Sequence, residues 1–234
     1  MRRIAIPVVL LSSVALLFAA EPGWRIKPSA QWTMADAKQL LTTSPWVGEA
    51  TPALLPKRSE FSRRDGGAMG GGEGVGLDSL SAGSLFGAGV AQPTKHGRRP
   101  SLTEPLEIRW ESAAPIRAAE TKAHEQDAPE IESGVYAIAI YDVPGLDSTN
   151  QKTLSRDLKK DAFLKSEGRK DRTPIRVDTL PQDNGLTTVV YIFPRTDEIT
   201  AAEKRLTFTA ILGRLSLAQY FYPEQMQLSG KLQL

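Results

Sequence analysis

The chain has 234 residues, 41% of them hydrophobic, so it is long enough to bury a substantial core. It contains no cysteine, which excludes disulfides, thiolate catalysis, cysteine metal sites and lipid attachment through an N-terminal cysteine. The 29 Lys and Arg residues and 27 Asp and Glu residues become 27 of each once Arg2 and Arg3 of the N-terminal segment are set aside. Because a neutral chain has no overall field that attracts polyanions, we expect no nucleic-acid partner.

The first twenty residues are typical of a secretory signal peptide. Two arginines precede an almost wholly apolar run, residues 4–18, and Ala19-Ala20 supplies the small residues that follow. Cleavage after Ala20 would place Phe18 at the −3 position, where a small residue is usual, so an uncleaved N-terminal anchor is the alternative. The segment 1–20 therefore predicts an exported protein, periplasmic or secreted, that contacts a membrane only if the anchor is retained.

Residues 21–50 are predicted to form a helical arm. Thr33 followed by Asp36 fits a helix N-cap with an acidic third residue. A helix of about ten residues is marginal by itself in water, so we expect the arm to dock on a larger domain. The expected docking residues are Trp32, Leu40, Leu41 and Trp46. A sugar-stacking aromatic platform is the alternative use of the tryptophans.

Residues 51–103 are predicted to be a disordered, Gly/Pro-rich basic linker. The stretch has too few large apolar residues to offset the entropy of ordering it. Its glycines do not form a dinucleotide-binding loop, because Leu77 and Ser79 stand where the third glycine of G-x-G-x-x-G is needed. No serine of the chain lies in a G-x-S-x-G motif either.

Residues 104–234 are predicted to form an α+β domain, a mostly antiparallel sheet with two covering helices. The helices are expected at 116–125 and at about 151–166, where Leu154, Leu158 and Ala162 recur at helical spacing. Apolar or alternating runs between turn residues predict strands at 106–110, 135–141, 175–180, 186–193, 205–212, 215–222 and 226–234.

The second of these helices is strongly basic. Its cations include Lys152, Arg156, Lys159 and Lys160. Such a face can contact an anionic surface, such as lipid headgroups or an acidic partner protein. A solvated helix face without a partner is the alternative interpretation.

Metal and cofactor chemistry has little support in the sequence. The only histidines are His96 and His124, and neither has a second ligand at metal-binding spacing. A Ser-His-Asp triad would depend on His124. We therefore expect no cofactor and no metal.

A pair of carboxylates is the remaining route to hydrolysis, since two acids at the right separation suffice. The candidates are Glu107, Glu111, Asp142, Asp197 and Glu198. Glu107 and Glu111 share the polar face of the first strand of the domain, opposite Trp110, so we expect two solvated acids with ordinary pKa values. Arg195 is expected to pair with a local acid rather than to bind an anion.

Four short motifs resemble a group of uncharacterised exported bacterial proteins. They are Ser44-Pro45-Trp46, Arg109-Trp110-Glu111-Ser112, Phe193-Pro194-Arg195 and the closing residues 230–234. The resemblance covers the arm and the C-terminal domain but not the linker. That group has no assigned activity, so the resemblance implies no site; it implies that the arm and the domain belong together.

These observations favour an exported, non-enzymatic binding or structural protein of the cell envelope, with an envelope protein as its partner. An extracytoplasmic hydrolase with paired carboxylates is one alternative, and a membrane-tethered accessory subunit is another. A cleft holding two acids with perturbed pKa values, away from any ion-pair partner, would favour the hydrolase. Retention of residues 1–20 would favour the tethered subunit.

Overall fold

The computed structural model describes residues 21–55, 104–146 and 151–234. The predicted signal segment and the predicted linker from residue 56 onward lie outside the described residues. The predicted α+β class is confirmed, because every strand pair is antiparallel and the helices are few. The helices are α1 (Gly23–Ile26), the 3-10 turn η1 (Ser29–Gln31), α2 (Met34–Thr42), α4 (Ala114–Ala123) and α5 (Gln151–Lys160). The strands are β1 (Val47–Ala50), β2 (Ala53–Leu54), β3 (Leu106–Trp110), β4 (Val135–Pro144), β5 (Phe163–Ser166), β6 (Arg176–Pro181), β7 (Leu186–Pro194), β8 (Leu206–Leu212), β9 (Leu215–Phe221), β10 (Gln227–Leu228) and β11 (Lys231–Leu232).

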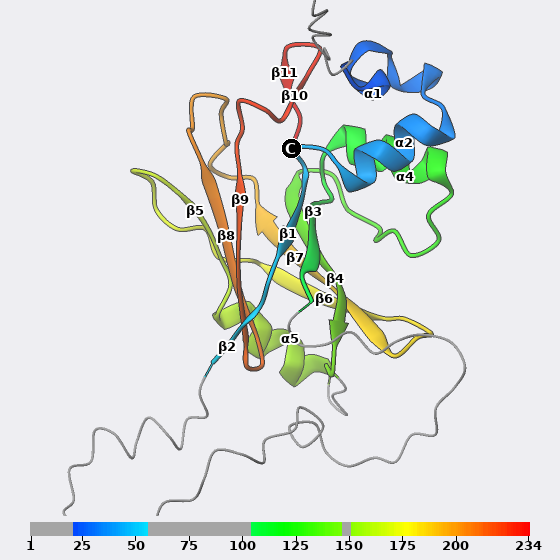
Figure 1. Ribbon diagram of the computed structural model, residues 1–234. Helices are drawn as coiled ribbons and strands as arrows, with labels where there is room; N and C mark the ends of the chain where they lie inside the picture. Colours follow the sequence, from blue (N-terminus) through cyan, green and yellow to red (C-terminus); the bar gives the residue numbers. More distant parts are fainter. Residues whose placement is uncertain (1–20, 56–103, 147–150) are drawn as a thin grey trace, which may run out of the picture.

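The strands divide between two sheets that share one core (Figure 1). One sheet has the order β1-β3-β4-β7-β6, the other has the order β2-β9-β8-β5, and β10 and β11 form a separate hairpin. Aromatic rings from the two sheets meet edge to face in the core. The ring centroids of Trp110 and Phe221 are 5.2 Å apart, and those of Tyr191 and Phe208 are 5.3 Å apart. The consecutive strands β7 and β8 thus belong to different sheets, a division that the apolar pattern along the chain did not predict.

The chain passes from one sheet to the other between β1 and β2. β1 pairs with β3, and β2, which follows after two intervening residues, pairs with β9. β1 crosses close to β9, where a Cβ atom on Gly48 would overlap the side-chain amide of Gln219. The predicted arm therefore ends in a strand of the five-stranded sheet, and β2 lies within the first residues of the predicted linker.

The arm is packed into the common core. Trp32, Leu40, Leu41 and Trp46 are all buried in the same cluster as the residues of both sheets. The indole nitrogen of Trp46 also donates a 2.7 Å hydrogen bond to the carbonyl of Gln233, close to the C-terminus. Because these rings are enclosed, they offer no free face on which a sugar could stack.

The start of α2 forms as predicted. The hydroxyl of Thr33 accepts a hydrogen bond from the Asp36 amide, and the Asp36 carboxylate accepts one from the Thr33 amide, which completes a capping box. The hydrogen bond from the Thr33 amide, followed by those from the side chains of Lys27 and Thr33, holds the pKa of Asp36 below its usual value.

The predicted helix 151–166 and the predicted last strand 226–234 both differ from the structure. α5 ends at Lys160, and the residues after it form β5, which pairs with β8. The expected last strand is the hairpin of β10 and β11, because Ser229 and Gly230 both adopt positive φ angles and reverse the chain. Such angles fit a tight turn between two strands.

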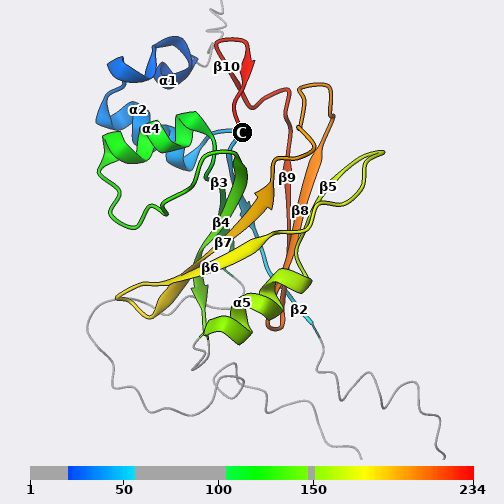
Figure 2. The same ribbon diagram turned by 180° about the vertical axis from the view of Figure 1, so that it is seen from behind.

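The helices lie at opposite ends of the two-sheet core (Figure 2). α2 packs against α4 beside one end of the five-stranded sheet, and α5 packs near β6 and β8 at the other end. Among the described residues, none of the helices has both the length and the apolar character required to cross a membrane.

Cleavage of the 56–103 segment is expected to leave the two parts of the fold associated. Trypsin should cut at Arg58, Arg63, Arg64 or Arg98, but β1 remains paired with β3 and Trp46 remains bonded to Gln233. A nicked sample should therefore run as two fragments on a denaturing gel and as one particle in size-exclusion chromatography. Separation of the fragments in native buffer would contradict the shared core.

Candidate functional site

A buried charge cluster lies on the outer face of the five-stranded sheet, opposite the core between the sheets. We define it as Glu107, Arg109, Glu111, Glu120, Glu125 and Tyr141. β3 and the residue after it supply Arg109 and Glu111, β4 supplies Tyr141, and α4 contributes Glu120. Arg109 is 4% exposed and Glu111 is fully buried.

This cluster corrects the prediction of two solvated acids. Glu111 is enclosed and Glu107 is half-buried, because α4 and the segment after it cover this end of the strand. Strand periodicity had separated the polar face from the apolar face correctly. It carried no information on which other element would cover the polar face.

Arg109 is the centre of the cluster. Its guanidinium donates hydrogen bonds to Glu107 at 2.6 Å and to Glu125 at 2.8 Å. The nearest oxygens of Glu120 and Glu111 lie 3.5 and 3.7 Å from it. Its planar group stacks 4.5 Å from the ring centroid of Tyr141, whose hydroxyl donates a 2.7 Å bond to Glu111. One cation thus holds two strands and the end of a helix together.

Glu111 and Glu120 are neighbouring acids within the cluster, and both lie beside Arg109. Burial raises the pKa of Glu120 to about 10, and hydrogen bonding to Glu111 and the negative charge of Glu111 act in the same direction. Glu120 is therefore protonated at neutral pH. Its carboxyl group can then donate a hydrogen bond to the buried Glu111 oxygen, which has no other hydrogen-bond partner among the described residues. Burial also raises the pKa of Glu107, although the charge of Arg109 opposes the rise.

The geometry of this pair does not suit carboxylate hydrolysis. Glycosidases hold their two carboxyl groups roughly 5–9.5 Å apart around an open substrate site. Glu111 and Glu120 are instead only 0% and 5% exposed, and both lie beside Arg109. A substrate cannot reach them in this structure.

The other candidate acids are dispersed. Asp142 is exposed on β4, where the register shifts and its φ angle is 55°. Asp197 binds Arg169 and Arg172 at 2.8 and 3.2 Å. Glu198 lies 3.7 Å from Arg195, which thus pairs with a local acid as expected.

Four members of the cluster were not recognised as site residues from the sequence: Arg109, Glu120, Glu125 and Tyr141. Glu120 follows Ile116 and Ala119 on the buried side of α4, and that spacing was the available indication. Tyr141 lies among the strongly apolar residues of β4, and nothing in its neighbourhood distinguished its hydroxyl.

The four cations proposed on the basic helix lie on the outer side of α5. All four are exposed, whereas Leu158 on the same helix is buried. Lys160 lies 3.1 Å from Asp157, Arg156 lies 3.8 Å from Asp157, and Lys159 donates a 2.8 Å bond to the carbonyl of Ile175. Arg156, Lys159 and Lys160 therefore each have a neighbouring partner within the protein.

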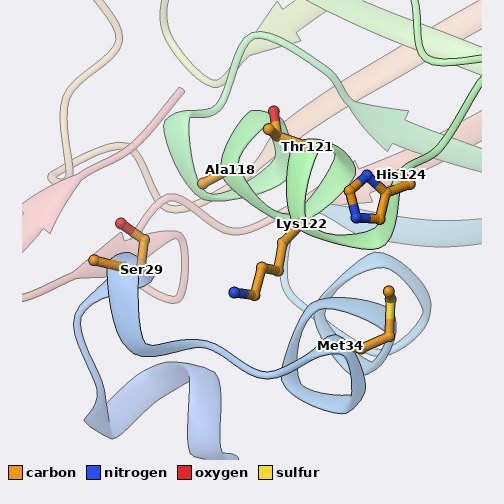
Figure 3. A pocket seen from close by; sticks show the side chains of 7 residues that line it. Ser29, Met34, Ala118, Thr121, Lys122 and His124 are labelled. Carbon is orange, nitrogen blue, oxygen red and sulfur yellow. The ribbon is translucent and has the colours of Figure 1, made fainter.

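A pocket of about 370 Å³ opens between η1, the start of α2 and the C-terminal half of α4 (Figure 3). Its lining consists of Ser29, Ala30, Met34, Ala118, Thr121, Lys122 and His124. His124 caps α4 with a φ angle of 56°, and its amide bonds the carbonyls of Glu120 and Thr121. His96 lies outside the described residues. No group of His, Asp or Glu side chains within the described ranges could hold a metal ion.

The chain was also compared with known proteins. No family model, curated protein or solved structure gave a match.

Proposed function

We propose that the protein is an exported, non-enzymatic binding protein of the cell envelope. The observation that carries this proposal is the closed state of the buried charge cluster. Its two acids Glu111 and Glu120 are enclosed, and both lie beside Arg109. An open pocket lies beside Lys122 and His124, and its mixed apolar and polar lining suits the recognition of a ligand.

The N-terminal sequence supports export. Residues 1–20 have the basic start, the apolar run and the small residues of a signal peptide. The protein without them has equal numbers of basic and acidic residues, which fits a partner recognised by a local surface rather than by overall charge. Retention of the segment would make the protein a tethered subunit.

Cell fractionation with intact-mass measurement tests the proposal. We expect untagged protein, captured by antibody after crosslinking, in the envelope or extracellular fraction with residues 1–20 removed. An untagged chain is preferable because Leu234 is buried and Gln233 is bonded to Trp46. A matched variant with Leu10→Arg and Leu11→Arg interrupts the apolar run and should stay in the cytoplasm.

The outcomes separate the alternatives. A crosslinked partner in stoichiometric amount supports a binding role, and an unprocessed mass together with membrane recovery supports the tethered subunit. Cytoplasmic recovery of the natural chain would reject export. Recovery of a processed monomer without a partner would reject an envelope protein as the partner. Small-molecule binding would then be the binding role to test.

A further inference from the structure

The lining of the pocket combines two kinds of side chain. Ala30, Met34 and Ala118 supply apolar surface, whereas Lys122 and His124 supply nitrogen groups that suit an anion. Figure 3 shows Lys122 extending from α4 into the space beside η1, with Met34 across from it on α2. We infer that the pocket binds a small amphipathic anion, with its carboxylate or phosphate at Lys122 and His124 and its apolar part against Met34 and Ala118. The inference rests on the proposed binding role and names its ligand class.

The wall formed by η1 and α2 is rigidly built. The indole nitrogen of Trp32 donates hydrogen bonds to the carbonyls of Trp24 and Lys27, at 3.1 and 3.0 Å. Lys27 in turn binds the carboxylate of Asp36, which also closes the capping box of α2. Because these bonds hold the turn in place without a ligand, little ordering cost remains for binding.

The wall formed by α4 is fixed from the opposite side. Glu120 is buried in the charge cluster, so the helix cannot turn without breaking that cluster. His124 adopts a left-handed conformation that glycine adopts more readily. A histidine at this position places an imidazole at the edge of the pocket, and strained residues of this kind are concentrated at binding sites.

Charge complementarity selects an anion. Lys122 is exposed, and it forms no ion pair with any of the residues that the structure describes. The acids next to the pocket residues in the chain are already placed against other cations, Asp36 against Lys27 and both Glu120 and Glu125 against Arg109. An ammonium group beside apolar surface should bind an oxyanion with a short apolar chain more tightly than it binds an oxyanion without the chain or an apolar chain without the charge. The volume of about 370 Å³ lies near the lower limit for small-molecule sites, so the ligand should be small.

Proton NMR of the full chain tests the inference, because only two histidines contribute imidazole signals. His96→Gln assigns the His124 signals. The probes are octanoate, acetate and octanol, all below the concentration at which octanoate forms micelles. We expect octanoate to shift the His124 signals at a concentration at least tenfold lower than acetate or octanol. Equal responses to octanoate and acetate would overturn the proposed apolar contact.

Two variants distinguish binding from a general effect on the fold. Lys122→Ala should weaken octanoate binding at least fivefold, whereas Lys204→Ala, at an exposed position outside the pocket lining, should leave it unchanged. His124→Gly should raise the melting temperature and weaken binding, a combination that misfolding cannot produce. Unchanged affinity in Lys122→Ala would overturn the assignment of the cation.

Further probes identify the source of the anion. Binding of octyl phosphate and of phosphatidylglycerol vesicles, but not of phosphatidylcholine vesicles, would assign a lipid headgroup. Binding of octanoate or octyl phosphate without vesicle binding would assign a free amphiphile. Failure of every probe would reject this ligand class. Localisation and crosslinking of the natural chain would be unaffected, so the proposed function would remain separately testable.

Discussion

Replacing Arg109 with methionine is expected to lower the free energy of unfolding by about 3–5 kcal/mol at neutral pH. The substitution removes the cation that contacts Glu107 and Glu125 and leaves the buried carboxylate of Glu111 without a nearby positive charge. Methionine retains much of the side-chain volume, so the loss would come mainly from uncompensated charge. Urea unfolding followed by tryptophan fluorescence would measure the change.

Two further variants serve as controls for the Arg109→Met experiment. Arg176→Met removes an arginine that is exposed and also contacts two acids, Glu132 and Asp178, so its effect should be at most about 1 kcal/mol. Adding Glu111→Gln and Glu125→Gln to Arg109→Met should recover part of the loss, because the charges that require compensation are then absent. A loss in Arg109→Met no greater than that in Arg176→Met would show that the cluster does not organise this side of the fold.

Glu120→Gln is expected to make the protein less sensitive to alkaline pH. Burial raises the pKa of Glu120 from 4.5 to about 10, so between these values the folded chain binds a proton that the unfolded chain has released. The stability from this group is complete below about pH 4.5 and is lost as the pH rises toward 10, at a limiting slope of about 1.4 kcal/mol per pH unit. Glutamine is neutral at every pH and removes this slope.

The measured quantity is the difference between the two proteins at each pH. From pH 5 to pH 9 the free energy of unfolding of Glu120→Gln should rise relative to that of the natural chain by about 2–5 kcal/mol. Any constant cost of the amide cancels in this comparison. Glu130→Gln, at an exposed position on the segment after α4, should give a flat difference. A flat difference in Glu120→Gln as well would mean that Glu120 is ionised in the folded protein.

Local structure was largely predictable from the sequence. The capping box of α2 depends on two side chains three residues apart, and α4 begins beside Pro115, whose fixed φ angle suits a first turn. The longer strands followed from apolar runs between turn residues. These features were predictable because each depends on interactions between residues that are close in the chain.

The short strands β1 and β2 and the division into two sheets were not predictable in this way. Four and two residues carry too little periodicity to be recognised, and β1 becomes a strand because β3 presents a free edge beside it. The arm thereby becomes part of the core instead of a docked appendage. Pairing between strands that are distant in sequence decided this outcome.

The chemistry of Glu111 shows the same limit. The sequence by itself determined that this residue lies on the face of its strand opposite Trp110, since successive side chains of a strand alternate. Only the tertiary structure decided that α4 covers that face, that Arg109 occupies its centre and that Glu120 adds a second carboxyl. The physical reason is that burial and the neighbouring Glu111 set the pKa of Glu120, and residues from other elements supply both. Composition, the N-terminal segment and local periodicity determined the class of fold and the expectation of export, while packing placed an expected pair of solvated acids in a cluster around the buried Arg109.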